Sequence, residues 1–125
     1  MEMKLELVYV PVSDVDRAKA FYVDKVGFND DVDVAVSEEI RFVQLTPPGS
    51  ACSIALGTGL TDSEPGSVQG LQMVIADADA AHKELLGRGV DVSDVDEQPW
   101  GRFVRFSDPD GNTWSLQQIP PGHQR

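Results

Sequence analysis

The residues best suited to metal binding are few and scattered along this sequence. A divalent ion such as zinc needs imidazole and carboxylate groups that converge on one point. His82 falls within a predicted helix, and His123 lies in the C-terminal tail. The acidic pairs Asp30-Asp31 and Asp94/Asp96 fall on predicted strand or turn edges, where such side chains usually face solvent. These residues therefore predict solvated surface rather than a metal centre.

The residue pattern does not indicate nucleophilic catalysis either. Cys52 is the single cysteine, and it stands close to Ile54 on a predicted strand, which favours a small buried hydrophobe. No Ser-His-Asp or Cys-His arrangement can be recognised. The Gly57-Thr58-Gly59 segment lacks the lysine and the helix that follow a phosphate-binding loop. Any site must therefore depend on how the fold brings ordinary residues together.

Composition narrows the class of partner. The chain has 125 residues, 41% of them hydrophobic and 25% charged, with a formal net charge of −11. This acidity argues against nucleic acid, whose phosphates favour clustered Lys and Arg. It would suit a cationic small molecule or a basic partner, or it simply keeps the protein soluble. The sequence contains no membrane-length apolar run, no signal-peptide core and no second cysteine for a disulfide, so we expect a cytoplasmic protein without a membrane partner.

The sequence repeats itself at half its length. Val12–Ala18 returns 63 residues later as Ile75–Ala81. Arg41-Phe42-Val43 returns 61 residues later as Arg102-Phe103-Val104. This period predicts two copies of one structural unit within a single domain over 1–125, as the chain length allows.

Each copy is predicted to contain one strand, one helix and three further strands. A capping-box-like helix start lies at Ser13 and Asp16, and Gly27 is suited to end that helix. In the first module, about 4–57, we expect strands Leu5–Val12, Phe28–Val36, Ile40–Thr46 and Ala51–Gly57, with the helix running to about Lys25.

A segment rich in Gly, Ser, Thr, Asp and Pro, residues 58–68, is predicted to link the two modules. The second module, about 69–119, repeats the pattern and contains a strong turn at Asp108-Pro109-Asp110-Gly111-Asn112. Its expected elements are strand Gln69–Ala76, helix Asp77–Gly87 and strands Val90–Val95, Arg102–Ser107 and Thr113–Ile119. Two tandem βαβββ modules predict the α+β class.

Three segments make the chain resemble the vicinal oxygen chelate superfamily, which includes glyoxalase I, bleomycin-resistance proteins and extradiol dioxygenases. They are Val12–Tyr22, Val26-Gly27-Phe28 and the Asp-Pro-Asp-Gly-Asn turn. The resemblance extends from about Lys4 to Ile119, and it implies a curled mixed sheet, a half-barrel, with helices outside and a cleft within. It does not imply one activity, because this scaffold hosts many chemistries.

The resemblance also implies where a metal would bind. Metal-using members take one ligand from the first strand and one from the last strand of each module, usually His or Glu. In this sequence those positions are Leu7, Ser53, Gly70 and Ser115. None of these residues is a good metal ligand, so the resemblance implies a protein without a metal cofactor.

Strand alternation predicts the residues that line the cleft. With Leu7 facing inward, the lining consists of Leu7, Tyr9, Ser53, Gly70, Gln72, Ser115 and Gln117, with Trp100 and Arg102 at the mouth. An apolar and aromatic lining with a few hydroxyl and amide groups suits a small organic molecule. The alternative is that these side chains simply fill the barrel.

Two classes of function remain in view. The first is a binding protein of the bleomycin-resistance type, expected to be a homodimer, which sequesters a small cationic or aromatic molecule without metal. The second is an enzyme of the same superfamily, of the lyase, isomerase or dioxygenase type, acting on a small metabolite. A lyase, isomerase or epoxide-type hydrolase would use Tyr9, Gln72 or Arg102 in place of a metal. The absent ligands weigh against a metal-dependent glyoxalase, and the sequence identifies no catalytic residue.

Overall fold

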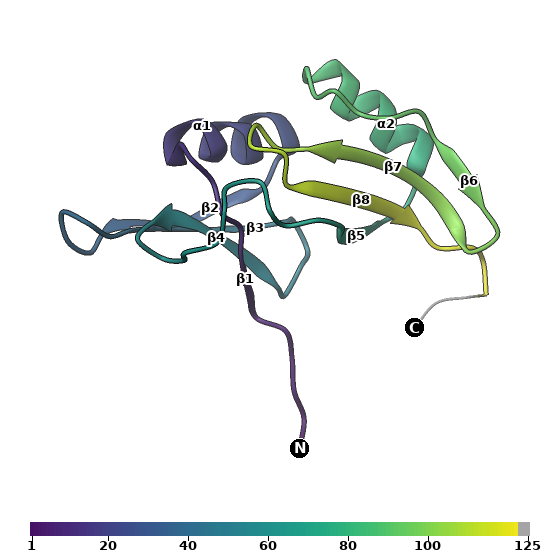
Figure 1. Cartoon of the computed structure of the whole chain (residues 1–125). Helices are drawn as coiled ribbons and strands as arrows, with labels where there is room; N and C mark the ends of the chain where they lie inside the picture. The colour runs from purple at the N-terminus through teal and green to yellow at the C-terminus, as the bar shows by residue number, and fades with distance from the viewer. Residues whose placement is uncertain (123–125) are drawn as a thin grey trace.

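A computed structural model describes residues 1–122 of the chain, so the predicted tail residue His123 lies outside the described part. The first module contains β1 (Leu7–Tyr9), α1 (Val15–Ala20), the π-helical turn η1 (Phe21–Val26), β2 (Asn29–Ala35), β3 (Arg41–Thr46) and β4 (Ser53–Thr58). The second contains β5 (Leu71–Ile75), α2 (Ala78–Gly87), β6 (Asp96–Gln98), β7 (Gly101–Ser107) and β8 (Thr113–Gln118). The two predicted modules are thus present (Figure 1).

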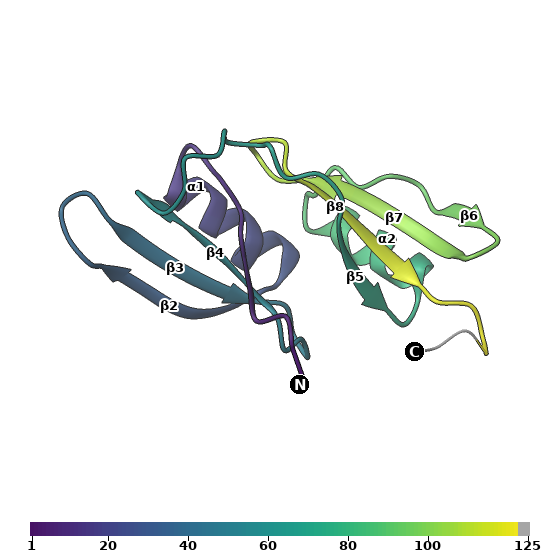
Figure 2. The same cartoon turned by 60° about the horizontal axis from the view of Figure 1, so that its bottom comes forward.

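Each module forms its own mixed sheet, and the two sheets have the same strand order. They run β1-β4-β3-β2 and β5-β8-β7-β6, with β1 parallel to β4 and β5 parallel to β8. Both helices lie on the same side of the pair of sheets (Figure 1), and β1 and β5 are the edges that face each other in the middle of the molecule (Figure 2). The predicted α+β class and the open, curled arrangement with helices outside are confirmed. No helix in the described part is long and apolar enough to cross a membrane.

Both helices begin at an aspartate. The side chain of Asp14 accepts a hydrogen bond from the Arg17 backbone N–H, and that of Asp77 accepts one from Ala80. The predicted start at Ser13 is therefore one residue early, because the Ser13 hydroxyl instead donates to Asp110 in the second module, at 2.6 Å. The predicted stop at Gly27 is confirmed, since its φ of 97° is one that glycine adopts without strain.

The predicted strand over 90–95 is wrong. The strand in this part of the chain is the three-residue β6, Asp96–Gln98. Val90 and Val92 turn their side chains into the core, and a hydrogen bond of 2.8 Å from Ser93 N to Arg105 O attaches the segment to β7. Val90 and Val92, which suggested a strand in the sequence, thus pack into the core from an irregular segment.

A buried polar network, here called the latch, joins the two modules. The Tyr22 hydroxyl donates to Asp108 Oδ2 at 2.8 Å and accepts from Trp114 Nε1 at 2.9 Å. The side-chain amide of Asn112 donates to the Pro11 carbonyl at 2.9 Å and to Asp108 Oδ2 at 2.8 Å. Burial, together with the Asp108 carboxylate, raises the pKa of Tyr22 far above its ordinary value, so this hydroxyl stays protonated.

Aromatic packing surrounds the latch. Tyr22 and Phe28 of the first module lie against Trp114 of the second, with ring centroids 5.8 and 5.6 Å from the indole. Trp114 also stacks on Phe106 at 6.2 Å. These rings belong to a single core that both modules share, located between the helices and the sheets. The modules therefore form one folding unit, because neither buries its aromatic face alone.

The repeated arginine forms the same contact in both modules, here called the arginine clasp. Arg41 binds Asp16 at the start of α1 (2.8 Å) and Asp33 on β2 (2.9 Å). Arg102 binds Asp79 at the start of α2 (2.9 Å) and Glu97 on β6 (2.5 Å). Each clasp fastens the first turn of a helix to the outer strand of its sheet.

Candidate functional site

Each sheet has one face that its helix leaves uncovered, here called the open face. Figure 2 shows the sheets in front of the helices. On the first sheet, Leu7 lies beside Ser53 and Tyr9 beside Ala55; on the second, Gln72 lies beside Ser115. The intervening residues Ile54, Trp114 and Leu116 are buried in the shared core, as the predicted alternation requires.

The open face of the first module satisfies its own polar groups. The Gln44 side chain donates to Ser53 Oγ at 3.2 Å, and the hydroxyls of Thr46 and Ser53 are 2.7 Å apart. Thr46 is also hydrogen-bonded to the carboxylate of Asp31. Ser53 is only 5% exposed, so the predicted cleft residue is enclosed by its neighbours. On this face Tyr9, half exposed, is the accessible aromatic group.

The open face of the second module carries an arginine and several hydroxyl side chains. The antiparallel register sets Arg105 opposite Ser115 and Ser107 opposite Thr113. These side chains, with Gly70 at one end, line an open cavity of about 760 Å³. The backbone N–H of Gly70 donates to Thr113 Oγ1 at 2.7 Å. The structure thus brings the predicted residues Gly70 and Ser115 into one cavity.

Two amides and one indole continue this open face. The Gln72 side chain donates to Gln117 Oε1 at 3.0 Å, and the Gln117 side chain donates to the Trp100 carbonyl at 2.9 Å. The Trp100 side chain is 62% exposed at the turn between β6 and β7. These three predicted cleft residues are therefore connected to one another, alongside Ser115.

Arg102 does not lie with Gln72, Gln117 and Trp100. It pairs with Gln118 across the sheet, and the Gln118 side chain accepts from Ala78 N at the start of α2. Its guanidinium binds Asp79 on that helix, so Arg102 occupies the helix side rather than the cleft mouth. The arginine on the open face is Arg105, three residues further along the alternating strand. Sequence reasoning missed Arg105, although alternation from Ser115 and the β7–β8 register would have identified it.

The register also corrects the pairing of serines between the modules. Val43 lies opposite Leu56 and its repeat Val104 opposite Leu116, so β4 and β8 correspond with an offset of 60 residues (116 − 56). The counterpart of Ser53 is therefore Thr113, and the counterpart of Ser115 is Ala55. The predicted equivalence of Ser53 and Ser115 is displaced by two residues, because the loops between the strands differ in length.

This corrected set of positions does not fit a metal ion. Leu7 and Gly70 offer no donor side chain, and on either pairing the last-strand positions hold Ser, Thr or Ala. Within residues 1–122, no three His, Cys, Asp or Glu side chains lie close enough to share an ion. His82 lies on α2 with its Nδ1 2.8 Å from the Ser93 carbonyl, away from the open face. Neutral hydroxyls do not replace imidazole or carboxylate ligands.

A second cavity, which the sequence did not predict, lies between the modules. It has a volume of about 510 Å³ and borders Phe28, the turn at Pro47 and Pro48, strand β5 and helix α2. Its wall includes both Gln72 and Leu85, so it extends around the edge of β5 from the open face toward the core. No sequence pattern could reveal it, since it exists only where the two modules meet.

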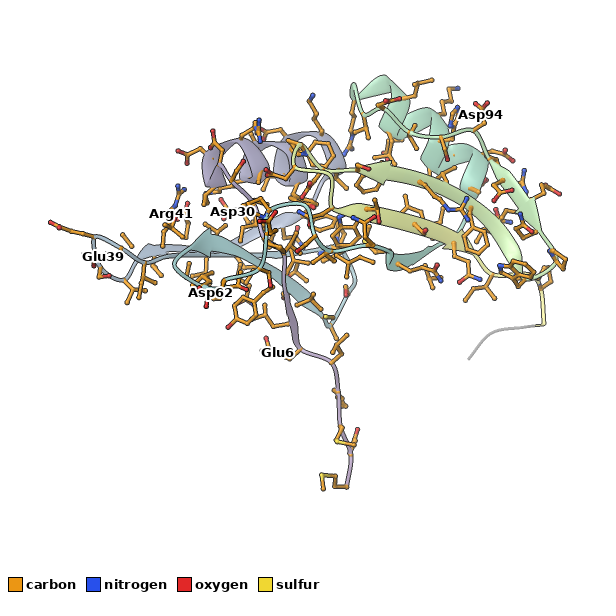
Figure 3. The ribbon with its side chains drawn as sticks, in the orientation of Figure 1. Glu6, Asp30, Glu39, Arg41, Asp62 and Asp94 are labelled. Atoms are coloured by element: carbon orange, nitrogen blue, oxygen red, sulfur yellow. The ribbon has the colours of Figure 1, made fainter. Side chains whose placement is uncertain are left out.

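Acidic side chains are dispersed over the molecule. Figure 3 shows Glu6 on the N-terminal arm, Glu39 at the end of the β2–β3 hairpin and Asp94 beside α2. These three groups lie on separate elements of the fold.

Comparison with known proteins identifies the family. The model of the Glyoxalase/Bleomycin resistance protein/Dioxygenase superfamily matches residues 4–116. The chain is similar to TnmS3, an antibiotic binding protein from Streptomyces sp. CB03234, with 39% identity, 95% of this chain and 98% of that chain covered, and a TM-score of 0.86. A superfamily member from Sphaerobacter thermophilus DSM 20745 is 34% identical, with 93% and 97% covered and a TM-score of 0.81.

A further relative is the uncharacterized protein YetH of Bacillus subtilis (strain 168), 25% identical over 122 residues, which cover 94% of this chain and all of that protein. The matches extend over almost the whole chain and include both modules. The chain belongs to the Glyoxalase/Bleomycin resistance protein/Dioxygenase superfamily.

Proposed function

We propose that this member of the superfamily binds a small organic molecule on its open faces and does so without a metal ion. The observation that carries the proposal is the cavity of about 760 Å³ on the second module, where the metal-ligand positions of the family hold Gly70 and Ser115 or Thr113. A cavity of this size is in the range that holds organic ligands. TnmS3, the similar antibiotic binding protein, supports a ligand-binding role.

The lining favours binding over chemistry. Gln72 and Gln117 offer amide donors and acceptors, and Trp100 and Tyr9 offer exposed aromatic surface for contact with a ligand. These four groups lie on the open faces beside the cavity, and none is a strong acid, base or nucleophile at neutral pH. The cavity itself is lined by hydroxyl groups, Arg105 and the carboxylates of Asp91 and Asp108, and Asp108 is already held by Tyr22 and Asn112. The combination supports recognition by shape, stacking and hydrogen bonds.

The proposal includes a homodimer. Val32, Val34 and Val74 are apolar residues on the sheets that are between 38% and 62% exposed, and two chains in contact would cover part of this surface. Light scattering on the purified protein should give twice the mass of the 13.6 kDa chain. A monomeric mass at micromolar concentration would contradict this part of the proposal and leave ligand binding unaffected.

Metal independence has its own test. We expect elemental analysis of the purified protein to find no stoichiometric zinc, nickel, iron or manganese, and titration with zinc or nickel to give no tight site. Stoichiometric binding that the substitution Ser115→Trp removed would overturn the metal-free proposal. Incubation with the hemithioacetal of methylglyoxal and glutathione should leave that compound unchanged.

Ligand binding is tested by thermal shift with a panel of aromatic acids, amines and neutral antibiotics. A compound at 100 times its Kd should add about 2.7 kcal/mol to the free energy of unfolding. Ser115→Trp fills the cavity of the second module and should abolish the shift, whereas Leu7→Trp probes the first module. Lys83→Trp, on the exposed side of α2, is the matched control. Shifts that persisted in both Ser115→Trp and Leu7→Trp would show that the open faces are not the site.

A further inference from the structure

Arg105 is the cation on the open face of the second module. Its strand position opposite Ser115, beside the pair Ser107 and Thr113, directs its side chain to the same face as theirs. Arg105 and these three hydroxyl residues all line the cavity of about 760 Å³, together with the acidic residues Asp91 and Asp108, of which Asp108 is held by Tyr22 and Asn112. In the first module the corresponding position, 61 residues earlier, is Gln44, whose amide is bound to Ser53. The cation is thus a feature of one module only.

The guanidinium of Arg105 is only partly satisfied by the protein. Its Nη1 donates to Asp96 Oδ2 at 2.9 Å, and one face lies 5.0 Å from the centre of the Phe103 ring. In the part of the chain from 1 to 122, Nε and Nη2 have no protein acceptor. By contrast, Arg41 and Arg102 use all three of their nitrogens in the clasps. Arg105 therefore presents two nitrogens with free N–H donors and has a side chain that is 46% exposed.

The hydroxyl groups beside Arg105 add further donors. Across residues 1–122, the hydroxyls of Ser107 and Ser115 have no hydrogen-bonding partner in the protein. A carboxylate accepts several hydrogen bonds and matches the planar fork of a guanidinium. Ser115 lies directly across the sheet from Arg105, and Ser107 follows two residues later on β7, so these side chains can together supply donors to one such group.

We propose that Arg105, assisted by Ser115 and Ser107, binds an oxyanion of the ligand, and that the ligand class is therefore an aromatic carboxylic acid or an ionised phenol. This inference rests on the proposed binding function and specifies the ligand chemistry. It differs from the cationic ligand that the net charge of −11 first suggests. Because that charge repels anions at a distance, recognition must come from direct contact with Arg105 rather than from steering.

The test uses naphthoate and naphthamide, which share a ring system and differ in charge. Titration calorimetry should show naphthoate binding more tightly than naphthamide by about tenfold or more, as expected for a hydrogen bond to a charged group. Arg105→Gln, which copies Gln44 of the first module, should remove this preference, and Arg105→Lys should restore part of it. Lys83→Gln removes the same charge from the exposed side of α2 and should keep the preference.

A substitution of Asp96 should change the affinity for naphthoate in the opposite direction to Arg105→Gln. Its carboxylate competes with the ligand for Arg105, so Asp96→Asn should increase the affinity for naphthoate several-fold and leave that for naphthamide unchanged. A purely structural role of Arg105 would give no such gain. Thermal midpoints of the free variants show that each one is folded.

The outcomes separate this inference from the proposed function. If both compounds bind equally and Arg105→Gln changes neither, the oxyanion inference is overturned and binding at the open face stands. If neither compound binds while neutral or cationic members of the panel do, the inference is again overturned alone. If no compound in the panel binds at the open faces, both proposals fail.

Discussion

The two modules share a helix-start contact and an arginine clasp, and they differ on their open faces. Both have an aspartate at the helix start and an arginine clasp from the helix to the outer strand. On the open face, however, Gln44 and Ser53 bind each other in the first module, whereas Arg105 and Ser115 remain partly free in the second. The comparison teaches that the helix starts and the clasps were kept in both copies, while groups available to a ligand are concentrated in one.

The latch gives the largest expected difference between the modules. Asp108, in the turn of the second module, accepts from Tyr22 and Asn112, whereas the corresponding turn of the first contains Pro47 and Pro48 and no buried carboxylate. Asp108→Ala leaves these buried donors unsatisfied and should lower the free energy of unfolding by about 3 kcal/mol. Pro48→Ala should change it by less than about 0.5 kcal/mol, as surface substitutions usually do. Urea denaturation measures both changes. Equal changes would show that the latch does not stabilise the fold more than an ordinary surface turn does.

Tyr22→Phe is a finer probe of the same network. It leaves Trp114 Nε1 without an acceptor and Asp108 with one donor fewer, which should cost about 1.5 kcal/mol. It should also change the pH dependence. The raised pKa of Tyr22 keeps it protonated in the fold, so stability is complete below the unfolded tyrosine pKa of about 10 and falls as the pH rises above it.

Denaturation of Tyr22→Phe between pH 8 and pH 11 should therefore show a shallower alkaline loss than the parent. If the free energy of unfolding of Tyr22→Phe fell with pH as steeply as that of the parent, the alkaline loss of stability would have to come from groups other than Tyr22.

The clasps should give the smallest effects, and these should be similar in the two modules. Arg41 holds the pKa of Asp33 below its usual range, and Arg102 does the same for Asp79. A lowered carboxyl pKa stabilises the fold above the unfolded pKa of about 3.9, and this contribution is lost as the pH falls through the folded value. Arg41→Gln and Arg102→Gln should each make the free energy of unfolding depend less steeply on pH below about pH 4.

Urea denaturation of both variants between pH 2 and pH 5 tests whether the two clasps contribute equally. At pH 7 both variants should lose less stability than Asp108→Ala, because these ion pairs are exposed to solvent. A loss confined to one module would show that the clasps are not equivalent.

Local signals in the sequence predicted the scaffold well. Gly27 and the Asp-Pro-Asp-Gly-Asn turn act through their own backbone preferences, so their positions were predictable. Val90 and Val92 were misleading because apolar residues look alike in a strand and in an irregular core segment. The π-helical turn at η1 left no pattern in the sequence that distinguishes it from an α-helix.

The site was less predictable than the fold. Alternation within Arg102–Ser107 places Arg102 and Arg105 on opposite faces, but which face is open depends on the register with β8. That register is set by the β7–β8 turn, and the loop lengths also displaced the counterparts of Ser53 and Ser115. Residue types along one strand cannot encode these relations between strands.

The latch also bears on how the chain acquires its structure during synthesis. The last strand of the first module ends at Thr58, yet the partners of Tyr22, which are Asp108 and Trp114, are made near the end of the chain. The first half thus leaves the ribosome with its tyrosine hydroxyl unpaired and the side of Phe28 that faces Trp114 uncovered. Such long-range contacts slow folding and prolong the exposure of apolar surface. The copy that is synthesised first completes its core only when the last strand of the second copy is in place.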